Sequence, residues 1–358
     1  MDQWDTAYFK RLRDFVGKAS RCGVVVELNL FCPFYDESQW RLSPMNAANN
    51  MNQVGAVART NVYTLDRHGG LLAVQESMVR KIVTELNGFD NVYYEICNEP
   101  YFGGVTLAWQ HQIADVIVAT ERRLPRQHLI SQNIANGRAR VEQPHPAVSI
   151  LNFHYASPPD TVGLNYELSR VIGDNETGFA GTNDAPYRIE AWSFILAGGG
   201  LFNHLDYSFA VGHENGTFVY PAKQPGGGNP VLRRQFRVLR DFINGLDFVR
   251  MKPDRTVARE LPPDCAVHVL TEPGLACALY LSRKQAPASP TGFPAPFSLA
   301  LPPGDYEAAW LDPLTGGELK RQFLTSHGSG VRLGVPPFIQ DIALRIVPRT
   351  LGARHTGR

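Results

Sequence analysis

Residues 91–102 read NVYYEICNEPYF, an apolar run that stops at the polar triplet Asn98-Glu99-Pro100. Valine, isoleucine and tyrosine favour extended backbone, so residues 91–97 predict a β-strand. Pro100 cannot donate a backbone hydrogen bond and ends the strand abruptly. Glu99 is therefore expected just beyond the carboxyl end of a buried strand.

Five further runs of this kind occur between residues 5 and 255, and stretches with apolar residues every three or four positions separate them. They are VVVELNL (24–30), HLISQN (128–133), VSILNFH (148–154), RVIGDNE (170–176) and GLFNHLDY (200–207). Strands that alternate with helices predict an α/β fold, here a (β/α)-barrel domain over residues 1–256. A closed barrel needs eight strands. Six candidates, preceded by a helix, predict a TIM-like barrel that is incomplete at its N-terminus.

Beyond residue 256 the periodicity changes from helical to alternating, and Pro, Gly and Asp separate short runs such as LACALYLSR and DYEAAWL. This pattern predicts a small antiparallel β-sandwich over residues 257–350, followed by a tail at 351–358. A chain of 358 residues is long enough for one large and one small domain.

Composition excludes several classes of function. Lys and Arg number 35 against 34 Asp and Glu, without a basic run, so we expect no nucleic-acid partner. Nowhere do eighteen uncharged apolar residues follow one another, so no membrane partner is expected, and the first fifteen residues lack the apolar core of an export signal. The five cysteines are scattered and predict free thiols. Calcium-loop, zinc-helix and G-x-S-x-G patterns are missing, so we expect no metal, no cofactor and no serine-based acyl transfer.

Two strand ends are acidic: Glu99 follows the run at 91–97, and Glu176 closes the run at 170–176. In parallel barrels, catalytic groups lie where strands end. A pair of carboxyl groups can hydrolyse a glycosidic bond, with retention if roughly 5 to 5.5 Å apart and with inversion at about 6.5 to 9.5 Å. A glutamate at a strand end can instead cap a helix or pair with a basic neighbour. These residues favour the catalytic interpretation, because the acidic end occurs twice, and they leave the stereochemistry open.

The stretch NVYYEICNEPYF resembles the Asn-Glu-Pro signature on the fourth strand of clan A glycoside hydrolases, the group that contains the family 5 cellulases and mannanases. The resemblance implies that Glu99 is the acid/base, that Asn98 contacts the sugar 2-hydroxyl, and that Glu176 is the nucleophile. It also implies retaining hydrolysis of a β-linked glucan or related oligosaccharide, with the first two barrel strands absent. The C-terminal sandwich is similar to one appended to some cellulase-like bacterial proteins.

The chain departs from that family in two respects. Clan members carry an arginine from the second strand near the nucleophile, and no second strand is available here to supply it. Family 5 members place a histidine and a tyrosine two residues apart on the sixth strand, whereas His154 and Tyr155 are adjacent. Because side chains alternate along a strand, we expect only one of these two to face the cleft easily.

Several other residues are candidates for binding the sugar. His154 is expected to hold the nucleophile through a hydrogen bond, with Tyr155 beside it. Asp206, on the last strand, is too polar for pure core and is expected in the cleft. Trp40 and Asn50, in the long loop after the first strand, are expected to provide a sugar platform and a hydrogen-bonding partner. Packing roles are the alternative for each.

An open parallel edge exposes apolar side chains and unpaired backbone groups. We therefore expect a homo-oligomer that covers the edge. The second hypothesis for function is a non-catalytic carbohydrate-binding remnant of a glycosidase barrel, which would bind sugar without turnover.

Overall fold

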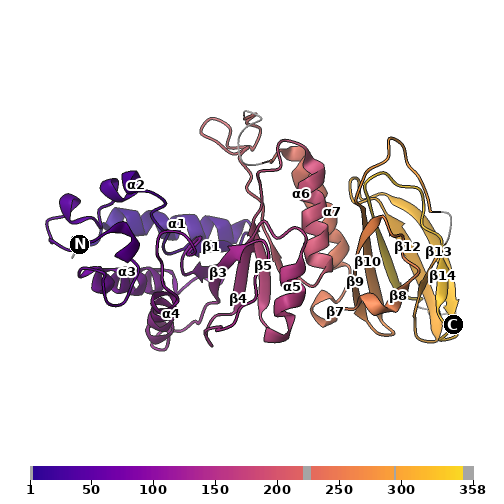
Figure 1. Cartoon of the computed structure of the whole chain (residues 1–358), viewed down its shortest axis with the longest axis horizontal. Helices are drawn as coiled ribbons and strands as arrows, with labels where there is room; N and C mark the ends of the chain where they lie inside the picture. Colours follow the sequence, from indigo (N-terminus) through magenta and orange to yellow (C-terminus); the bar gives the residue numbers. More distant parts are fainter. Residues whose placement is uncertain (1–2, 221–226, 294–295, 350–358) are drawn as a thin grey trace, which may run out of the picture. The chain divides into compact units, whose positions relative to one another are not determined.

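The computed structural model describes residues 3–220, 227–293 and 296–349 (Figure 1). The predicted tail at 351–358 lies outside these residues. By the contacts of its backbone the chain forms two compact units, Met1–Phe153 with Leu168–Gly173, and His154–Glu167 with Asp174–Arg358. The boundary passes along two strands of one sheet, so each of these strands begins in the first unit and ends in the second.

That sheet has six strands in the order of the sequence, and each of the six predicted runs supplies one. The strands are β1 (Val26–Asn29), β2 (Val92–Glu95), β3 (Ile130–Asn136), β4 (Ile150–His154), β5 (Val171–Glu176) and β6 (Leu201–Phe202). Pairing of β1 with β2 and of β2 with β3 is parallel. The prediction of an incomplete parallel barrel is confirmed: β1 is an edge strand that pairs only with β2.

A buried polar network fills part of the interior of the first unit. Glu95 on β2 is fully buried, and its carboxylate accepts hydrogen bonds from Ser131 Oγ at 3.1 Å and from Asn152 Nδ2 at 2.6 Å. Three adjacent strands thus contribute one polar residue each. Such a network is stable when its members are satisfied by one another, and it ties the register of β2, β3 and β4 together.

Helices alternate with the strands, as the sequence predicts. They are α1 (Thr6–Arg21), α2 (Glu37–Leu42), α3 (Leu71–Leu86), α4 (Leu107–Glu121), α5 (Asp160–Asn165), α6 (Asp184–Leu196) and α7 (Pro230–Asn244). Helix α1 begins where Asp5 accepts hydrogen bonds from two backbone N–H groups of the first turn. Helix α3 buries residues spaced three and four apart, and α4 packs against it through Trp109, whose indole N–H donates to Gln75.

The C-terminal part forms two antiparallel sheets, which confirms the predicted β-sandwich. The strands are β7 (Lys252–Pro253), β8 (Ala258–Arg259), β9 (Cys265–Glu272), β10 (Ala276–Arg283), β11 (Phe297–Leu299), β12 (Gly304–Leu311), β13 (Glu318–Ser326), β14 (Val331–Leu333) and β15 (Asp341–Pro348). One sheet has the order β13-β12-β15-β10-β9-β7 and the other β14-β11-β8. Buried side chains from both sheets, among them Trp310 and Phe297, form the core.

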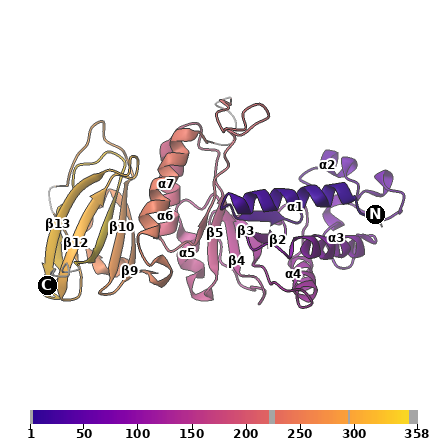
Figure 2. The same ribbon diagram turned by 180° about the vertical axis from the view of Figure 1, so that it is seen from behind.

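Within the second unit, α6 and α7 lie against the larger sheet, as both views show (Figures 1 and 2). Trp192 of α6 stacks on Tyr280 of β10 in a second apolar cluster. Beside it Arg188 forms a buried two-point ion pair with Asp341, with Nε–Oδ2 at 3.0 Å and Nη2–Oδ1 at 2.8 Å. The sandwich is therefore fixed to the last helices of the barrel through a dry apolar contact and a buried charge pair.

The thiols and the helices bear on two further expectations. No disulfide forms among the five cysteines; Cys97, Cys265 and Cys277 are buried, while Cys22 and Cys32 are exposed. In the described parts of the chain, every helix is too short or too polar to span a bilayer.

Candidate active site

The backbone around Glu99 is bent into a conformation that non-glycine residues rarely adopt. Glu99 has a φ of 40°, in the left-handed region. Its N–H donates to Asn133 Oδ1 at 3.0 Å, and the N–H of Asn98 donates to the carbonyl of Phe31 at 3.0 Å. Neighbouring strands therefore hold the turn in place. Backbone strain held in this way is concentrated at functional sites.

Two tyrosines contact the Glu99 carboxylate. The Tyr35 hydroxyl donates to Oε2 at 2.6 Å, and the Tyr101 hydroxyl donates to Oε1 at 3.3 Å. Asn98 Nδ2 donates in turn to the Tyr35 oxygen at 3.2 Å. Burial and the bond to Glu99 raise the pKa of Tyr35 well above its usual value, so this phenol stays protonated. Because a hydroxyl both donates and accepts, Glu99 can gain or lose a proton while keeping these neighbours.

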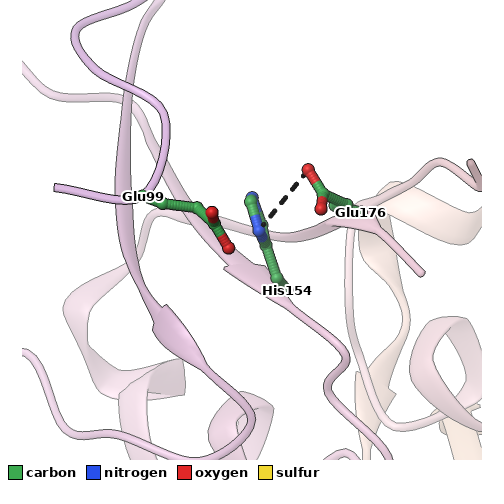
Figure 3. Close-up of side chains that lie close together, drawn as sticks. All are labelled: Glu99, His154 and Glu176. Atoms are coloured by element: carbon green, nitrogen blue, oxygen red, sulfur yellow. Dashed lines mark ion pairs between the residues drawn. The ribbon is translucent and has the colours of Figure 1, made fainter. Parts of the chain in front are cut away.

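In the second unit, Glu176 ends β5 with both carboxylate oxygens contacted. Tyr155 donates its hydroxyl proton to Oε1 at 2.5 Å, and His154 Nδ1 lies 3.6 Å from Oε2 (Figure 3). The His154 side chain is fully buried, whereas 23% of the Glu176 side chain is exposed. The carboxylate is therefore oriented from below and reachable from solvent, as a nucleophile must be.

Both His154 and Tyr155 contact Glu176, contrary to the expectation that only one of two adjacent strand residues could do so. The physical reason is the backbone of Tyr155, whose φ of 54° takes it out of the extended conformation as β4 ends. Its N–H nevertheless pairs with the carbonyl of Glu176 at 2.9 Å. The alternation of side chains therefore stops at His154, and the next side chain swings to the same carboxylate.

A second acidic residue lies below Glu176 on the same face of β5. Asp174 is fully buried, and burial followed by the charge of Glu190 raises its pKa to about 9. Burial raises the pKa of Glu190, on α6, to about 7. Asp174 is thus uncharged at neutral pH and adds no second negative charge beside the Glu176 carboxylate.

The structure corrects the roles expected of Trp40 and Asn50. Trp40 is 4% exposed, its ring packs near Phe34, and its indole N–H donates to the carbonyl of Val57 at 3.2 Å. The Asn50 amide donates to three backbone carbonyls of its own loop, including that of Asn46 at 2.8 Å. Both residues hold the loop after β1 together, because a long loop must satisfy its buried polar groups internally.

Asp206 also has a structural partner in place of a free position in the cleft. Arg233 of α7 donates to its Oδ2 at 2.6 Å, and Ser208 donates to Oδ1 through both its N–H and its hydroxyl. Although burial opposes it, these bonds together lower the pKa of Asp206. Its polarity, which suggested a cleft residue, is explained by this ion pair.

Sequence reasoning missed Tyr35, Asn133 and Asp174. Asn133 closes a predicted strand and Asp174 precedes Glu176 by two positions, so inspecting every strand end and its i−2 neighbour would have found both. Tyr35 comes from a loop, where sequence gives no direction. Figure 3 also draws Glu99, which belongs to the first unit; with His154 and Glu176 it is of a type that ligates metals. We assign the two glutamates to acid–base chemistry because each accepts a phenolic hydrogen bond.

Comparison of the fold with solved structures gives two close matches. A glycoside hydrolase of family 5 from Bacteroides vulgatus aligns with a TM-score of 0.61 and 12% identity, over 95% of this chain and 74% of that one. Another structure, described as a glycoside hydrolase, aligns with a TM-score of 0.59 and 12% identity, over 95% and 89%. The fold is shared with glycoside hydrolases. No protein-family model and no curated protein sequence matches the chain, so this likeness concerns the fold alone.

Proposed function

We propose that the chain is a retaining β-glycoside hydrolase, with Glu99 as general acid/base and Glu176 as nucleophile. The observation that carries the proposal is the setting of Glu176: a partly exposed carboxylate at a strand end, held by Tyr155 at 2.5 Å and His154 at 3.6 Å. An exposed acid with both oxygens oriented is prepared to attack an electrophilic carbon rather than to stabilise the fold.

The topology of the sheet supports a joint role for the two glutamates. Glu99 follows β2 and Glu176 ends β5, and both strands belong to one sheet. The hydrogen bonds from Val171 to Ser149 and from Tyr155 to Glu176 run in the same chain order, so β4 and β5 are parallel. Strands of a parallel barrel end at one face, where catalytic groups of such folds gather.

The proposed reaction has two steps. In the first, a Glu176 oxygen bonds to the anomeric carbon while the bond to the leaving oxygen breaks and takes the Glu99 proton. In the second, Glu99 removes a proton from water, the water oxygen attacks the anomeric carbon, and the bond to Glu176 breaks. Tyr155 holds the Glu176 oxygen it contacts, and the neutral Asp174 keeps the local negative charge low. Asn98 is proposed to contact the sugar 2-hydroxyl.

The proposed substrate is a β-linked glucan or related oligosaccharide. The alternative is a carbohydrate-binding remnant of a glycosidase barrel. One observation favours it: β1 is the sheet edge where a closed barrel would continue with two more strands. The remnant would bind sugar and release no product.

Hydrolysis of a panel of aryl β-glycosides by wild type, Glu99→Gln and Glu176→Gln separates the two. The enzyme predicts turnover in wild type that falls by at least about a thousandfold in Glu176→Gln. Glu142→Gln, an exposed glutamate, is a matched control for the substitution itself. Sugar binding by a folded wild type that turns over none of the glycosides, including natural oligosaccharides, would favour the remnant.

A further inference from the structure

A cleft of about 440 Å³ lies in the first unit beside the loop that carries Glu99. Tyr101 forms one wall, and the segment after β3 forms another with Arg140 and Glu142. Gln110 of α4 and Asn133 of β3 also line it. The volume falls within the range of small-ligand sites. All of its lining residues lie between positions 100 and 143, so the cleft belongs wholly to this unit.

The cleft offers polar groups whose hydrogen-bonding capacity the described residues do not use. Gln132 Oε1 and Asn133 Nδ2 have no hydrogen-bond partner there, although these residues are 3% and 1% exposed. The Arg140 and Glu142 side chains extend from an exposed segment and form no ion pair among the described residues. Buried amide atoms without partners are costly, and a ligand or water that pairs with them recovers the cost.

The remaining lining is apolar and includes Leu107, a helix residue that is 39% exposed. A lining that combines an aromatic ring, aliphatic side chains and both donors and acceptors matches a sugar, which has apolar ring faces rimmed by hydroxyls. One positive and one negative side chain together select against a strongly charged ligand. The chemistry therefore fits a neutral glycosyl unit.

Tyr101 connects this cleft to Glu99. Its ring lines the cleft, while its hydroxyl donates to Glu99 Oε1 at 3.3 Å and also to Asn136 Oδ1. An occupant of the cleft would thus be separated from the acid by one tyrosine side chain. The proton of the acid goes to the leaving oxygen, so this is the side of the site on which the leaving sugar would lie.

We propose that this cleft is the subsite for the leaving-group sugar of a β-linked oligosaccharide, with Arg140 and Glu142 as its hydrogen-bonding residues and Tyr101 as the wall shared with the acid. The inference deepens the proposed function and rests on it for the identity of the leaving side. Binding to the cleft, however, can be measured without turnover.

Binding is tested first, by saturation-transfer NMR with cellobiose, mannobiose and xylobiose as the probes. The variants are the double substitution Arg140→Ala with Glu142→Ala, and Arg138→Ala as the matched control, because Arg138 is exposed on the same segment and does not line the cleft. At least one disaccharide is expected to bind wild type, with affinity lower by about tenfold in the double variant and unchanged in Arg138→Ala. Equal affinity in all three proteins, or no binding of any probe to wild type, overturns the proposal.

Transfer to an acceptor then tests the side of the site. A sugar in this cleft would intercept the glycosyl intermediate: its hydroxyl oxygen bonds to the anomeric carbon, the bond to Glu176 breaks, and Glu99 takes the proton. With an aryl glycoside as donor, the ratio of transfer to hydrolysis is expected to fall about tenfold in the double variant and to stay constant in Arg138→Ala. A ratio unchanged in the double variant rejects the leaving side. Loss of all turnover with cleft binding intact rejects the hydrolase proposal and leaves the sugar site standing.

Discussion

Tyr155 donates its hydroxyl to Glu176 Oε1 at 2.5 Å from a left-handed backbone position, φ 54°, directly after the last residue of β4. A tyrosine that continued the strand would point away from the carboxylate, because successive side chains alternate. The bent backbone at this position therefore serves the contact with Glu176, as strained positions at functional sites do. The hydroxyl stabilises the charged carboxylate before it attacks.

Replacing Tyr155 with phenylalanine removes that hydroxyl and keeps the ring. A hydrogen bond to a charged group is worth enough to lower kcat/KM by about 10- to 100-fold, and the fall should come mainly from kcat because the bond acts on the reacting carboxylate. Steady-state kinetics with an aryl β-glycoside measures it. Tyr207→Phe, at an exposed tyrosine of the same unit, should retain wild-type kinetics. Equal kinetics in Tyr155→Phe would remove this residue from the reaction.

Asp174 should make stability depend on pH. Its pKa is about 9 in the folded protein and 3.8 as the ordinary value, so between these pH values the folded state holds a proton that the unfolded state has lost. The free energy of unfolding therefore falls as pH rises from about 4 to 9. Asp174→Asn mimics the neutral acid and should raise Tm relative to wild type more at pH 8 than at pH 5. Thermal unfolding at both pH values measures this.

Glu190→Gln provides the comparison for that experiment. The pKa of Glu190 is raised from 4.5 to about 7, so its stabilising effect should grow only up to about pH 7 and then level off. Asp174→Asn should continue to gain up to about pH 9. A Tm difference for Asp174→Asn that is the same at pH 5 and pH 8 would mean that Asp174 is charged in the folded protein.

The Arg188–Asp341 pair should be essential to the attachment of the sandwich. Both side chains are 3% exposed, so Arg188→Met leaves a buried carboxylate without its cation and should lower the free energy of unfolding by about 3–5 kcal/mol. Urea titration measures it. Adding Asp341→Leu should recover most of the loss, because two apolar residues then replace the pair. Arg237→Met, which breaks an exposed pair with Asp241, should cost less than about 1 kcal/mol.

The edge of the parallel sheet leads to a prediction about assembly. Val24 and Val25, just before β1, are 51% and 64% exposed, and Tyr8 and Phe15 on α1 are 55% and 61% exposed. We propose that a second copy of the chain covers this apolar edge, because β1 has a strand partner on one side only.

Light scattering tests that assembly. The wild type should be at least a dimer, and Val24→Lys with Val25→Lys should shift it to monomer. Val249→Lys, at an exposed valine of the second unit, should leave the oligomer unchanged. A monomeric wild type across micromolar concentrations would contradict the proposal.

Strand runs and their acidic ends could be predicted from the sequence, whereas side-chain partners could not. The run at 170–176 predicts β5, which spans Val171–Glu176, because apolar content and turn residues are local signals. Trp40 has the composition of a sugar platform and lies in the core, and Asp206 has the polarity of a cleft residue and pairs with Arg233. Such partners come from segments distant in sequence, for which periodicity carries no signal.

The position of Tyr35 illustrates the same limit near the acid. It contacts Glu99 across 64 positions of sequence, from a loop whose direction depends on its own hydrogen bonds. The paired contacts of His154 and Tyr155 were hidden for a different reason: a single φ value reverses the rule of alternation, and sequence does not report φ.

The most direct test of the central proposal is mass spectrometry of the protein after incubation with an activated 2-deoxy-2-fluoro β-glycoside, which slows the release of a glycosyl intermediate. The proposed mechanism predicts one added fluoroglycosyl group, located by peptide sequencing on Glu176, and none in Glu176→Gln. Turnover of ordinary aryl glycosides without any such adduct, or an adduct on Glu99, would contradict the assignment of Glu176 as the nucleophile.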